Sequence, residues 1–213
     1  DAYIRSEGLG VEQEVYPLEL CKCKDCGYVF LPIVVNPEII YRNYIYVSTS
    51  SMGLSNHFCG YAESVLAKLN LTKTSLVVDI GSNDGTLLKF FKAAGMNVLG
   101  IEPATEIARR ASDEGIPTIP DFFDPSLASK LASEHGHASL ITVNNLFANI
   151  DDLESFMTGV SALLASDGCF VMESSYLADM VDNMVFDFIY HEHLSYFSVT
   201  PLQKFFSRFG FEL

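Results

Sequence analysis

The feature that most constrains the fold is a buried-strand pattern that runs into a glycine turn. Residues 75–86 read Ser-Leu-Val-Val-Asp-Ile-Gly-Ser-Asn-Asp-Gly-Thr, and residues 97–103 read Asn-Val-Leu-Gly-Ile-Glu-Pro. The apolar, β-branched residues 76–80 are typical of a strand buried in a parallel sheet. The spacing then predicts a helix over residues 86–94 and a second strand that ends at Glu102. This order is that of a nucleotide-binding βαβ unit.

The chemistry of the turn separates two classes of nucleotide. A dinucleotide fingerprint, G-x-G-x-x-G, seats a pyrophosphate on a helix N-terminus, but the turn from Gly81 to Gly85 lacks the middle glycine. The nearby carboxylates of Asp79 and Asp84 would repel a pyrophosphate and would suit a sulfonium and an ammonium group. Glu102 can accept hydrogen bonds from both hydroxyls of a ribose. We therefore predict S-adenosylmethionine rather than NAD as the ligand; an ordinary tight turn without a ligand is the alternative.

Further strand and helix patterns extend this unit into one Rossmann-like α/β domain with helices on both faces of the sheet. The third predicted strand is followed by Asp121, Phe122 and Phe123, which either contact an adenine or belong to the core. The fourth is followed by residues 144–149, and ligands of open α/β sheets bind at that edge. The expected strands span residues 116–119, 139–143 and 169–173, and a turn at 167–168 precedes the last of them. The expected helices span residues 57–69, 105–114 and 153–164.

Composition excludes several partners. The formal net charge of -14 and the pI of about 4.6 argue against binding to nucleic acid, because no basic patch is available for phosphates. No apolar run reaches the roughly 18 residues of a membrane span. Five cysteines do not form a disulfide framework. We expect a cytoplasmic monomer. Both ends look cut, with residues 209–213 resembling the beginning of a strand, so we expect a fragment.

The cysteines near the N-terminus have metal-ligand spacing. Cys23 and Cys26, followed by Gly27, could share one zinc ion between two short strands at residues 18–20 and 28–31. Cys21 is the nearest third ligand. We predict half of a zinc ribbon, and the alternative is three reduced cysteines without a metal.

Residues 36–56 are rich in tyrosine and serine. They offer many hydroxyl groups and rings without an apolar face. A loop that contacts the ligand is one prediction, and a surface loop packed by its own aromatic residues is the other.

A second stretch that could carry chemistry lies at residues 186–197. Tyr190, His191, Glu192 and His193 stand together between aromatic residues. Such a group can supply a general base near neutral pH, a carboxylate that orients it and a phenol that stabilises an oxyanion. A metal site is disfavoured because no further ligand follows at a suitable spacing.

Taken together, these motifs resemble the sugar C-methyltransferases of nucleotide-deoxyhexose pathways. The resemblance spans nearly the whole chain and keeps the order and spacing of the motifs. They are Cys23-x-x-Cys26, Tyr44-x-Tyr-x-Ser48, Asp79-Ile-Gly-Ser-Asn-Asp-Gly85, Gly100-Ile-Glu-Pro103, Asp121-Phe-Phe123 and Tyr190-His-Glu-His193.

The resemblance implies a class I methyltransferase fold with three domains. Members have an N-terminal zinc-binding lobe, a central S-adenosylmethionine domain and a C-terminal domain that helps to bind the nucleotide sugar. We expect part of the first in residues 1–56, all of the second in 57–185, and the catalytic segment with the start of the third in 186–213. The family methylates a sugar carbon next to a ketone through a base-generated enolate, so the implied substrate is a nucleotide-linked keto-deoxysugar.

The resemblance also assigns roles to residues. His193 would be the base, Glu192 would orient the sugar, and Tyr190 would donate to the developing enolate. Asn149 stands where the family often has a histidine, and it could donate a hydrogen bond without serving as a base near pH 7. Tyr44 would help to close over the cofactor, and the predicted cofactor-binding set is Tyr46, Ser48, Asp79, Gly81, Asn83, Asp84, Gly85, Glu102, Pro103, Asp121, Phe122, Phe123 and Asn145.

Three other functions stay open at this stage. The chain could be an O- or N-methyltransferase acting on a related sugar. It could be a cofactor-binding module that is inactive without its missing C-terminal domain. An NAD-dependent sugar enzyme is the third possibility.

Overall fold

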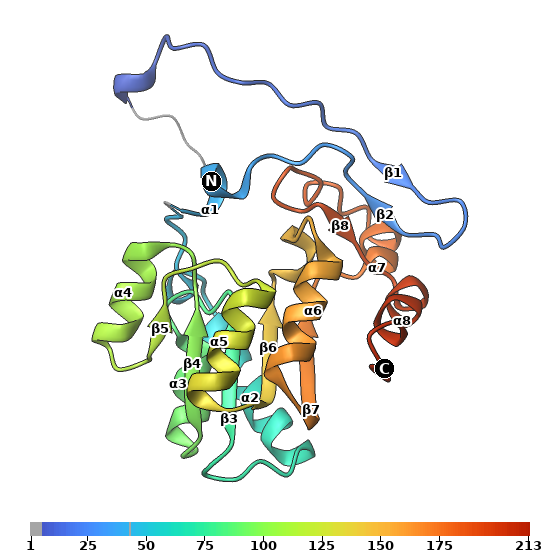
Figure 1. Ribbon diagram of the computed structural model, residues 1–213. Coiled ribbons are helices and arrows are strands. Elements are labelled where there is room, and N and C mark those ends of the chain that lie inside the picture. The colour runs from blue at the N-terminus through green and yellow to red at the C-terminus, as the bar shows by residue number, and fades with distance from the viewer. Residues whose placement is uncertain (1–5, 43) are drawn as a thin grey trace.

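A five-stranded parallel sheet forms the centre of the molecule in the computed structural model, which describes residues 6–42 and 44–213 (Figure 1). The strand order is β5-β4-β3-β6-β7, so the chain winds outward from β3 to β5 and then continues on the other side of β3. The switch point between β3 and β6 is where such sheets bind ligands. This arrangement confirms the predicted Rossmann-like α/β class. The strands are β3 (Leu76–Ile80), β4 (Asn97–Ile101), β5 (Thr118–Ile119), β6 (Ala138–Asn144) and β7 (Leu164–Glu173).

Helices cover both faces of this sheet. Two helices on one of these faces begin with a side-chain cap: Asp124 accepts a hydrogen bond from the amide of Leu127, and Asp152 accepts one from the amide of Ser155. The α-helices are α1 (Pro37–Tyr41), α2 (Leu54–Lys68), α3 (Thr86–Ala93), α4 (Thr105–Asp113), α5 (Pro125–His135), α6 (Leu153–Leu163), α7 (Leu177–Asp182) and α8 (Val199–Ser207); short 3-10 turns are η1 (Ser6–Gly8), η2 (Ser48–Ser50) and η3 (Phe147–Asn149).

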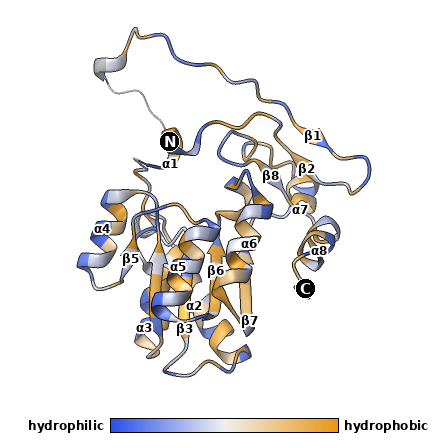
Figure 2. Ribbon diagram, in the orientation of Figure 1, coloured by the Kyte–Doolittle hydropathy of each residue, from blue (hydrophilic) through white to orange (hydrophobic). Residues whose placement is uncertain are grey.

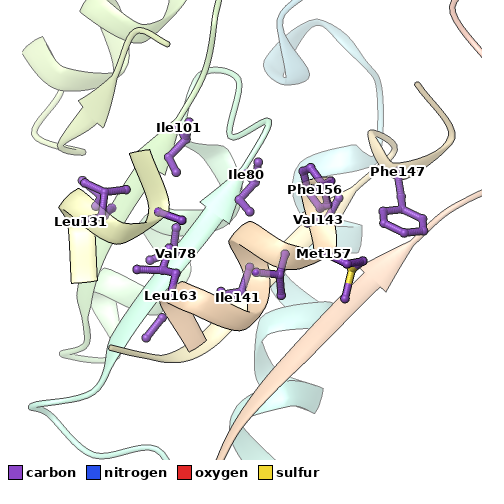
Figure 3. Packing of buried hydrophobic residues seen from close by; sticks show 14 of the residues in the cluster. Val78, Ile80, Ile101, Leu131, Ile141, Val143, Phe147, Phe156, Met157 and Leu163 are labelled. Carbon is purple, nitrogen blue, oxygen red and sulfur yellow. The ribbon is translucent and has the colours of Figure 1, made fainter. Parts of the chain in front are cut away.

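Successive side chains of each strand point to opposite faces of the sheet, and this explains why helices pack on both faces. Val78 and Ile141 point to one face, where they pack with the apolar side chains of α5 and α6 (Figure 3). Their neighbours Val77 and Leu140 point to the other face and pack against α2 and α3. Hydropathy follows the same division, with apolar residues along the strands and polar residues on the outer sides of the helices (Figure 2).

A second, antiparallel sheet lies at the end of the molecule above the carboxyl ends of the strands (Figure 1). It consists of β1 (Cys21–Lys22), β2 (Val29–Phe30) and β8 (Ser195–Tyr196). The predicted strand at residues 18–20 is wrong, because the backbone pairs with β2 only from Cys21 onward.

Other boundaries differ from the predictions. Helix α2 begins at Leu54, three residues before the predicted start. Strand β7 runs through the predicted turn at 167–168, where its register against β6 shifts. Residues 209–213 form no strand; they follow helix α8, and Phe211 packs against the core.

The first and last predicted segments meet in space. Strand β8, which lies in the predicted segment 186–213, pairs with β2, which lies in the predicted segment 1–56. Phe206 of α8 packs in the core beside the parallel sheet. The division into three domains therefore stays a prediction, as do the monomeric state and the cytoplasmic location. Of the helices within residues 6–42 and 44–213, none combines the length and the apolar character that crossing a membrane requires.

Candidate functional site

A cavity of about 830 Å³ opens at the carboxyl ends of the parallel strands. Its volume is in the range of small-molecule and cofactor sites. The walls include Gly81 after β3, Glu102 after β4 and Asn144 at the end of β6. Fourteen of the predicted catalytic and cofactor-binding residues line it, and so does Tyr44. The fourteen are Tyr46, Ser48, Asp79, Gly81, Asn83, Glu102, Pro103, Asp121, Phe122, Phe123, Asn145, Tyr190, Glu192 and His193.

Gly81 brings the backbone of the turn close to the loop that follows β6. Its φ angle is +76°, a conformation that side chains disfavour. A Cβ atom at this position would also lie 2.8 Å from Cδ2 of Leu146. A residue larger than glycine would therefore combine a strained backbone with a shift of the Leu146 side chain.

Glu102 is buried and held by backbone amides. Its two carboxylate oxygens accept hydrogen bonds from the amides of Asn83, at 3.0 Å, and Ala104, at 2.8 Å. Burial raises the pKa of Glu102, and these amides oppose the rise because they favour the charged form. Each oxygen keeps a second lone pair, so the carboxylate can still accept hydrogen bonds from the hydroxyls of a ribose.

Asp79 is the second buried acid of the cavity. It accepts a hydrogen bond of 2.6 Å from Oγ1 of Thr142 on the neighbouring strand β6. Burial raises the pKa of Asp79 to about 7, and the negative charge of Glu102 acts in the same direction, while the Thr142 hydrogen bond opposes it. A cationic ligand would favour the charged form of this group.

Asp84 and Gly85 lie outside the cavity wall and have other contacts. Oδ2 of Asp84 accepts a hydrogen bond from the amide of Thr49, and Oδ1 accepts one from the hydroxyl of Thr86 at the start of α3. Gly85 precedes α3 at a φ of +72°, and a Cβ atom there would meet Ile116 at 3.0 Å. Asp84 thus fixes residues 44–51, which we call the strap, to the turn.

His193 has the hydrogen bonds expected of a base. Its Nδ1 atom lies 2.9 Å from the carbonyl oxygen of Phe188, and since a carbonyl only accepts, Nδ1 carries a proton. In the neutral ring Nε2 is then unprotonated and faces the hydroxyl of Tyr190 at 3.4 Å. The imidazole also stacks on the ring of Phe188.

Glu192 joins the strap to the segment that carries His193. Tyr44 donates to its carboxylate at 3.5 Å, and Tyr41 donates to its backbone carbonyl at 3.3 Å. Burial raises the pKa of both phenols, and the charge of Glu192 raises them further. Burial and Glu192 likewise raise the pKa of Tyr190. All these phenols stay protonated near neutral pH and are hydrogen-bond donors.

Several polar atoms in the cavity wall are buried without a hydrogen-bond partner in the described part of the chain. They are Oγ of Ser82, both amide atoms of Asn144 and Oδ1 of Asn149. Buried polar groups are nearly always satisfied, so atoms of this kind can bind water or a polar ligand in the cavity. Asn144 was not among the predicted site residues, although its position as the last residue of a strand could have identified it.

The charge of the cavity is negative. Seven carboxylates line it, and no lysine or arginine does so among the residues that the structure describes. Arg42 lies nearby, where its guanidinium group pairs with Glu38 and covers the ring of Phe122 at 4.9 Å. The cavity therefore fits a ligand with positive charge, as S-adenosylmethionine has, better than a pyrophosphate.

The cysteines do not complete a metal site. Cys23 and Cys26 lie in the turn between β1 and β2, and the amides of Cys26 and Asp25 hold the pKa of Cys23 below its ordinary value. Within residues 6–42 and 44–213, no three His, Cys, Asp or Glu side chains are grouped to hold a metal ion. A structural zinc site needs four ligands, so the described residues do not complete one, and the predicted half of a zinc ribbon stays a prediction.

The fold and this cavity define a methyltransferase domain. Residues 57–213 match the family described as Methyltransferase domain, and the chain belongs to that family.

Among known proteins, the chain is similar to the C-methyltransferase NovU of Streptomyces niveus, with 36% identity over 198 residues. That match covers 93% of this chain and 47% of NovU, so the chain spans about half the length of this relative. The fold is also similar to two solved structures at low sequence identity. The YcgJ protein of Bacillus subtilis has a TM-score of 0.58 at 19% identity, covering 72% of this chain and 68% of that one. Magnesium protoporphyrin IX methyltransferase of Synechocystis, with bound S-adenosylhomocysteine, has a TM-score of 0.55 at 13% identity, covering 75% and 74%.

Proposed function

We propose that this chain transfers a methyl group from S-adenosylmethionine to a carbon next to the ketone of a nucleotide-linked keto-deoxysugar. The observation that carries the proposal is that the side chains of Tyr190, Glu192 and His193 line the same cavity as the buried carboxylate of Glu102. The similarity to a C-methyltransferase supports carbon as the accepting atom.

The residues of the cavity can hold the cofactor and leave one side open for the sugar. Glu102 would bind the ribose, Phe122 and Phe123 would contact the adenine, and Asp79 would face the positive charge. When bound, S-adenosylmethionine supplies an electrophilic methyl group. The seven carboxylates favour its sulfonium and ammonium charges.

The catalytic side of the cavity supplies a base and a donor. Nε2 of His193 takes the proton from the sugar carbon, and the electrons of that C–H bond form an enolate. The hydroxyl of Tyr190 donates to the enolate oxygen, while Glu192 orients the sugar and stabilises the charged imidazole. A cofactor held by Glu102 and Asp79 would supply the methyl carbon that the enolate carbon attacks, and the electron pair of the broken sulfur–carbon bond would stay on sulfur.

Replacing the base tests this assignment. We expect His193→Ala to lower the rate of methyl transfer by about 100-fold or more, while the Kd for S-adenosylhomocysteine stays within about twofold of the starting protein. His191→Ala is the matched control, because His191 lies in the same segment but donates to the carbonyl of Pro17 and does not line the cavity. Normal turnover in His193→Ala would remove this residue from the mechanism.

Isotope exchange separates carbon from heteroatom transfer. In D₂O, with S-adenosylhomocysteine in place of the methyl donor, we expect deuterium to enter the sugar at the carbon next to the ketone and expect His193→Ala to abolish the exchange. An O- or N-methyltransferase needs no such exchange. Methylation without exchange at that carbon would therefore favour the heteroatom alternative.

A second candidate is a cofactor-binding module that needs the rest of its protein for activity. The negative cavity favours it, because a nucleoside diphosphate needs cations that the described lining residues do not provide. Calorimetry with a nucleoside diphosphate distinguishes the two functions. Binding of the diphosphate would support the complete enzyme, whereas binding of S-adenosylhomocysteine alone would support the module.

A further inference from the structure

The side chain of Asn83 is engaged by the strap. Its Oδ1 atom accepts a hydrogen bond of 2.9 Å from the amide of Ser48, and its Nδ2 group donates one of 2.9 Å to the carbonyl oxygen of Tyr46. Oδ1 also accepts from the amide of Asp84 at 2.9 Å. The residue is 9% exposed, so these bonds form away from water. They are therefore costly to leave unmade.

The backbone of Asn83 faces a different partner. Its amide donates to Oε2 of Glu102 at 3.0 Å. The φ angle of Asn83 is +50°, in the left-handed region that asparagine tolerates better than most residues. This conformation lets one residue hold the strap with its side chain and Glu102 with its amide.

The strap continues from Asn83 to the other side of the cavity. Two residues before Tyr46, Tyr44 donates to the carboxylate of Glu192. Asp84 holds the strap at a further point, through the amide of Thr49. One short segment thus connects the residues around Glu102 with the segment that carries His193.

We propose that Asn83 is a positioning residue that fixes the strap to the glycine turn, so that the ribose acceptor Glu102 and the carboxylate of Glu192 are aligned by the same contact. The role of Glu102 as the acceptor for the ribose of S-adenosylmethionine rests on the proposed function. The contact between Asn83 and the strap does not, and it can be measured in the ligand-free protein.

Asn83→Gly is the informative variant. Glycine keeps the positive φ angle and the amide that donates to Glu102, and it removes only the bonds to the strap and to the amide of Asp84. Arg42 precedes the strap and is a site for trypsin. We expect cleavage after Arg42 to become about tenfold faster, the effect of losing hydrogen bonds of ordinary strength. Cleavage after Lys22, in the hairpin of β1 and β2, should keep its rate and reports any general loss of stability.

Two further variants complete the test. Asn83→Asp keeps the acceptor for Ser48 but turns a carboxylate oxygen toward the carbonyl oxygen of Tyr46, so its cleavage after Arg42 should be at least as fast as that of Asn83→Gly. Asn183→Gly is the matched control, because Asn183 is exposed, makes one side-chain hydrogen bond, to the carbonyl of Asp179, and does not line the cavity. It should leave cleavage after Arg42 unchanged.

The affinity for S-adenosylhomocysteine provides the second readout. We expect its Kd to rise about tenfold in Asn83→Gly, in parallel with faster cleavage after Arg42. A weaker affinity without faster cleavage would overturn the proposal, because Asn83 would then act as a direct ligand. Unchanged cleavage and affinity would overturn it as well. A parent protein that binds no S-adenosylhomocysteine would contradict the proposed function, while the cleavage result would still decide the role of Asn83.

Discussion

Asp79 places an ionisable group in the interior of the protein, where only 4% of it is exposed. Its neighbour Thr142 supplies one hydrogen bond, which is too little to replace the hydration that the charged form has lost. The neutral form is therefore favoured in the folded protein. In the unfolded chain the same carboxyl group titrates at its ordinary value.

This difference predicts a pH dependence of stability. The folded pKa of about 7 lies above the ordinary value of 3.8, so between these two pH values the folded protein binds more protons than the unfolded chain. The contribution of Asp79 to stability is thus complete below about pH 4, and it is lost as the pH rises through 7.

Asp79→Asn should remove this dependence, because the amide is neutral at every pH and can still accept from Thr142. Urea unfolding between pH 5 and pH 8 should show the parent protein losing free energy of unfolding relative to the variant, by at most about 3 kcal/mol. Parallel curves for the two proteins would contradict the predicted ionisation of Asp79.

Among the elements, the turn after β3 and the loop after β6 are packed against each other. Gly81 and Leu146 form the contact, and each belongs to a loop that lines the cavity. Both the positive φ angle of Gly81 and the approach of Leu146 oppose a side chain at this position. Truncating Leu146 changes only the second effect, so a double-mutant cycle separates the two.

Gly81→Ala should destabilise the protein by about 3 kcal/mol, from the left-handed conformation and the clash together. In a Leu146→Ala background the closest atom, Cδ2, is absent and only the 3.3 Å contact with Cβ of residue 146 remains, so the cost should fall to about 2 kcal/mol. Gly53→Ala is the control, because Gly53 has a φ of +87° and a Cβ atom there would meet nothing within 4 Å. Equal costs of Gly81→Ala in both backgrounds, measured by urea unfolding, would show that Leu146 does not oppose the added methyl group.

Strands β3, β4 and β6 could be predicted from the sequence because each is a mainly apolar run whose residues are largely buried. Helix α5 was not predicted, since its small and polar residues give a weak apolar pattern, although Asp124 and Pro125 are typical of a helix start. Strand β1 was misplaced because two residues paired with a partner leave almost no periodic signal.

The sequence predicted those residues of the candidate site that directly follow a strand. The ligand-facing residues after β3 and β4 follow from the general location of sites in α/β sheets. The contacts of Asp84 and Asn83 with the strap were not predictable, because they join segments that lie 35 residues apart.

At the scale of the whole molecule, a separate apolar cluster holds the small sheet together. It contains Val29, Leu31, Met180 and Tyr196, and it is distinct from the clusters on the two faces of the parallel sheet. The amide of Leu31 donates to the carbonyl of Leu194, the residue that follows His193. The position of the proposed base thus depends on residues near the other end of the described chain.

Leu31→Ala should loosen this cluster selectively. Truncating a buried leucine costs about 2–4 kcal/mol, and we expect amide hydrogen exchange to accelerate at Leu31, Leu194 and Tyr196 while Val78 keeps its rate. The matched control is Leu131→Ala, in the core against the parallel sheet, which should accelerate exchange at Val78. Equal acceleration of all four amides in Leu31→Ala would show that the small sheet unfolds only together with the large one.

The pairing of β2 with β8 has a consequence for the order of assembly. Tyr28 and Ser195, whose hydroxyl groups are hydrogen-bonded across this pair, are 167 residues apart. A ribosome makes the complete parallel sheet, from β3 to β7, before Ser195 exists, so the central domain can fold while β1 and β2 still lack their partner strand. The segment with Tyr190, Glu192 and His193 is synthesised after the parallel sheet and joins a strand that was made before that sheet. The strand ends that frame the proposed cofactor pocket can therefore be in place before the proposed base is added.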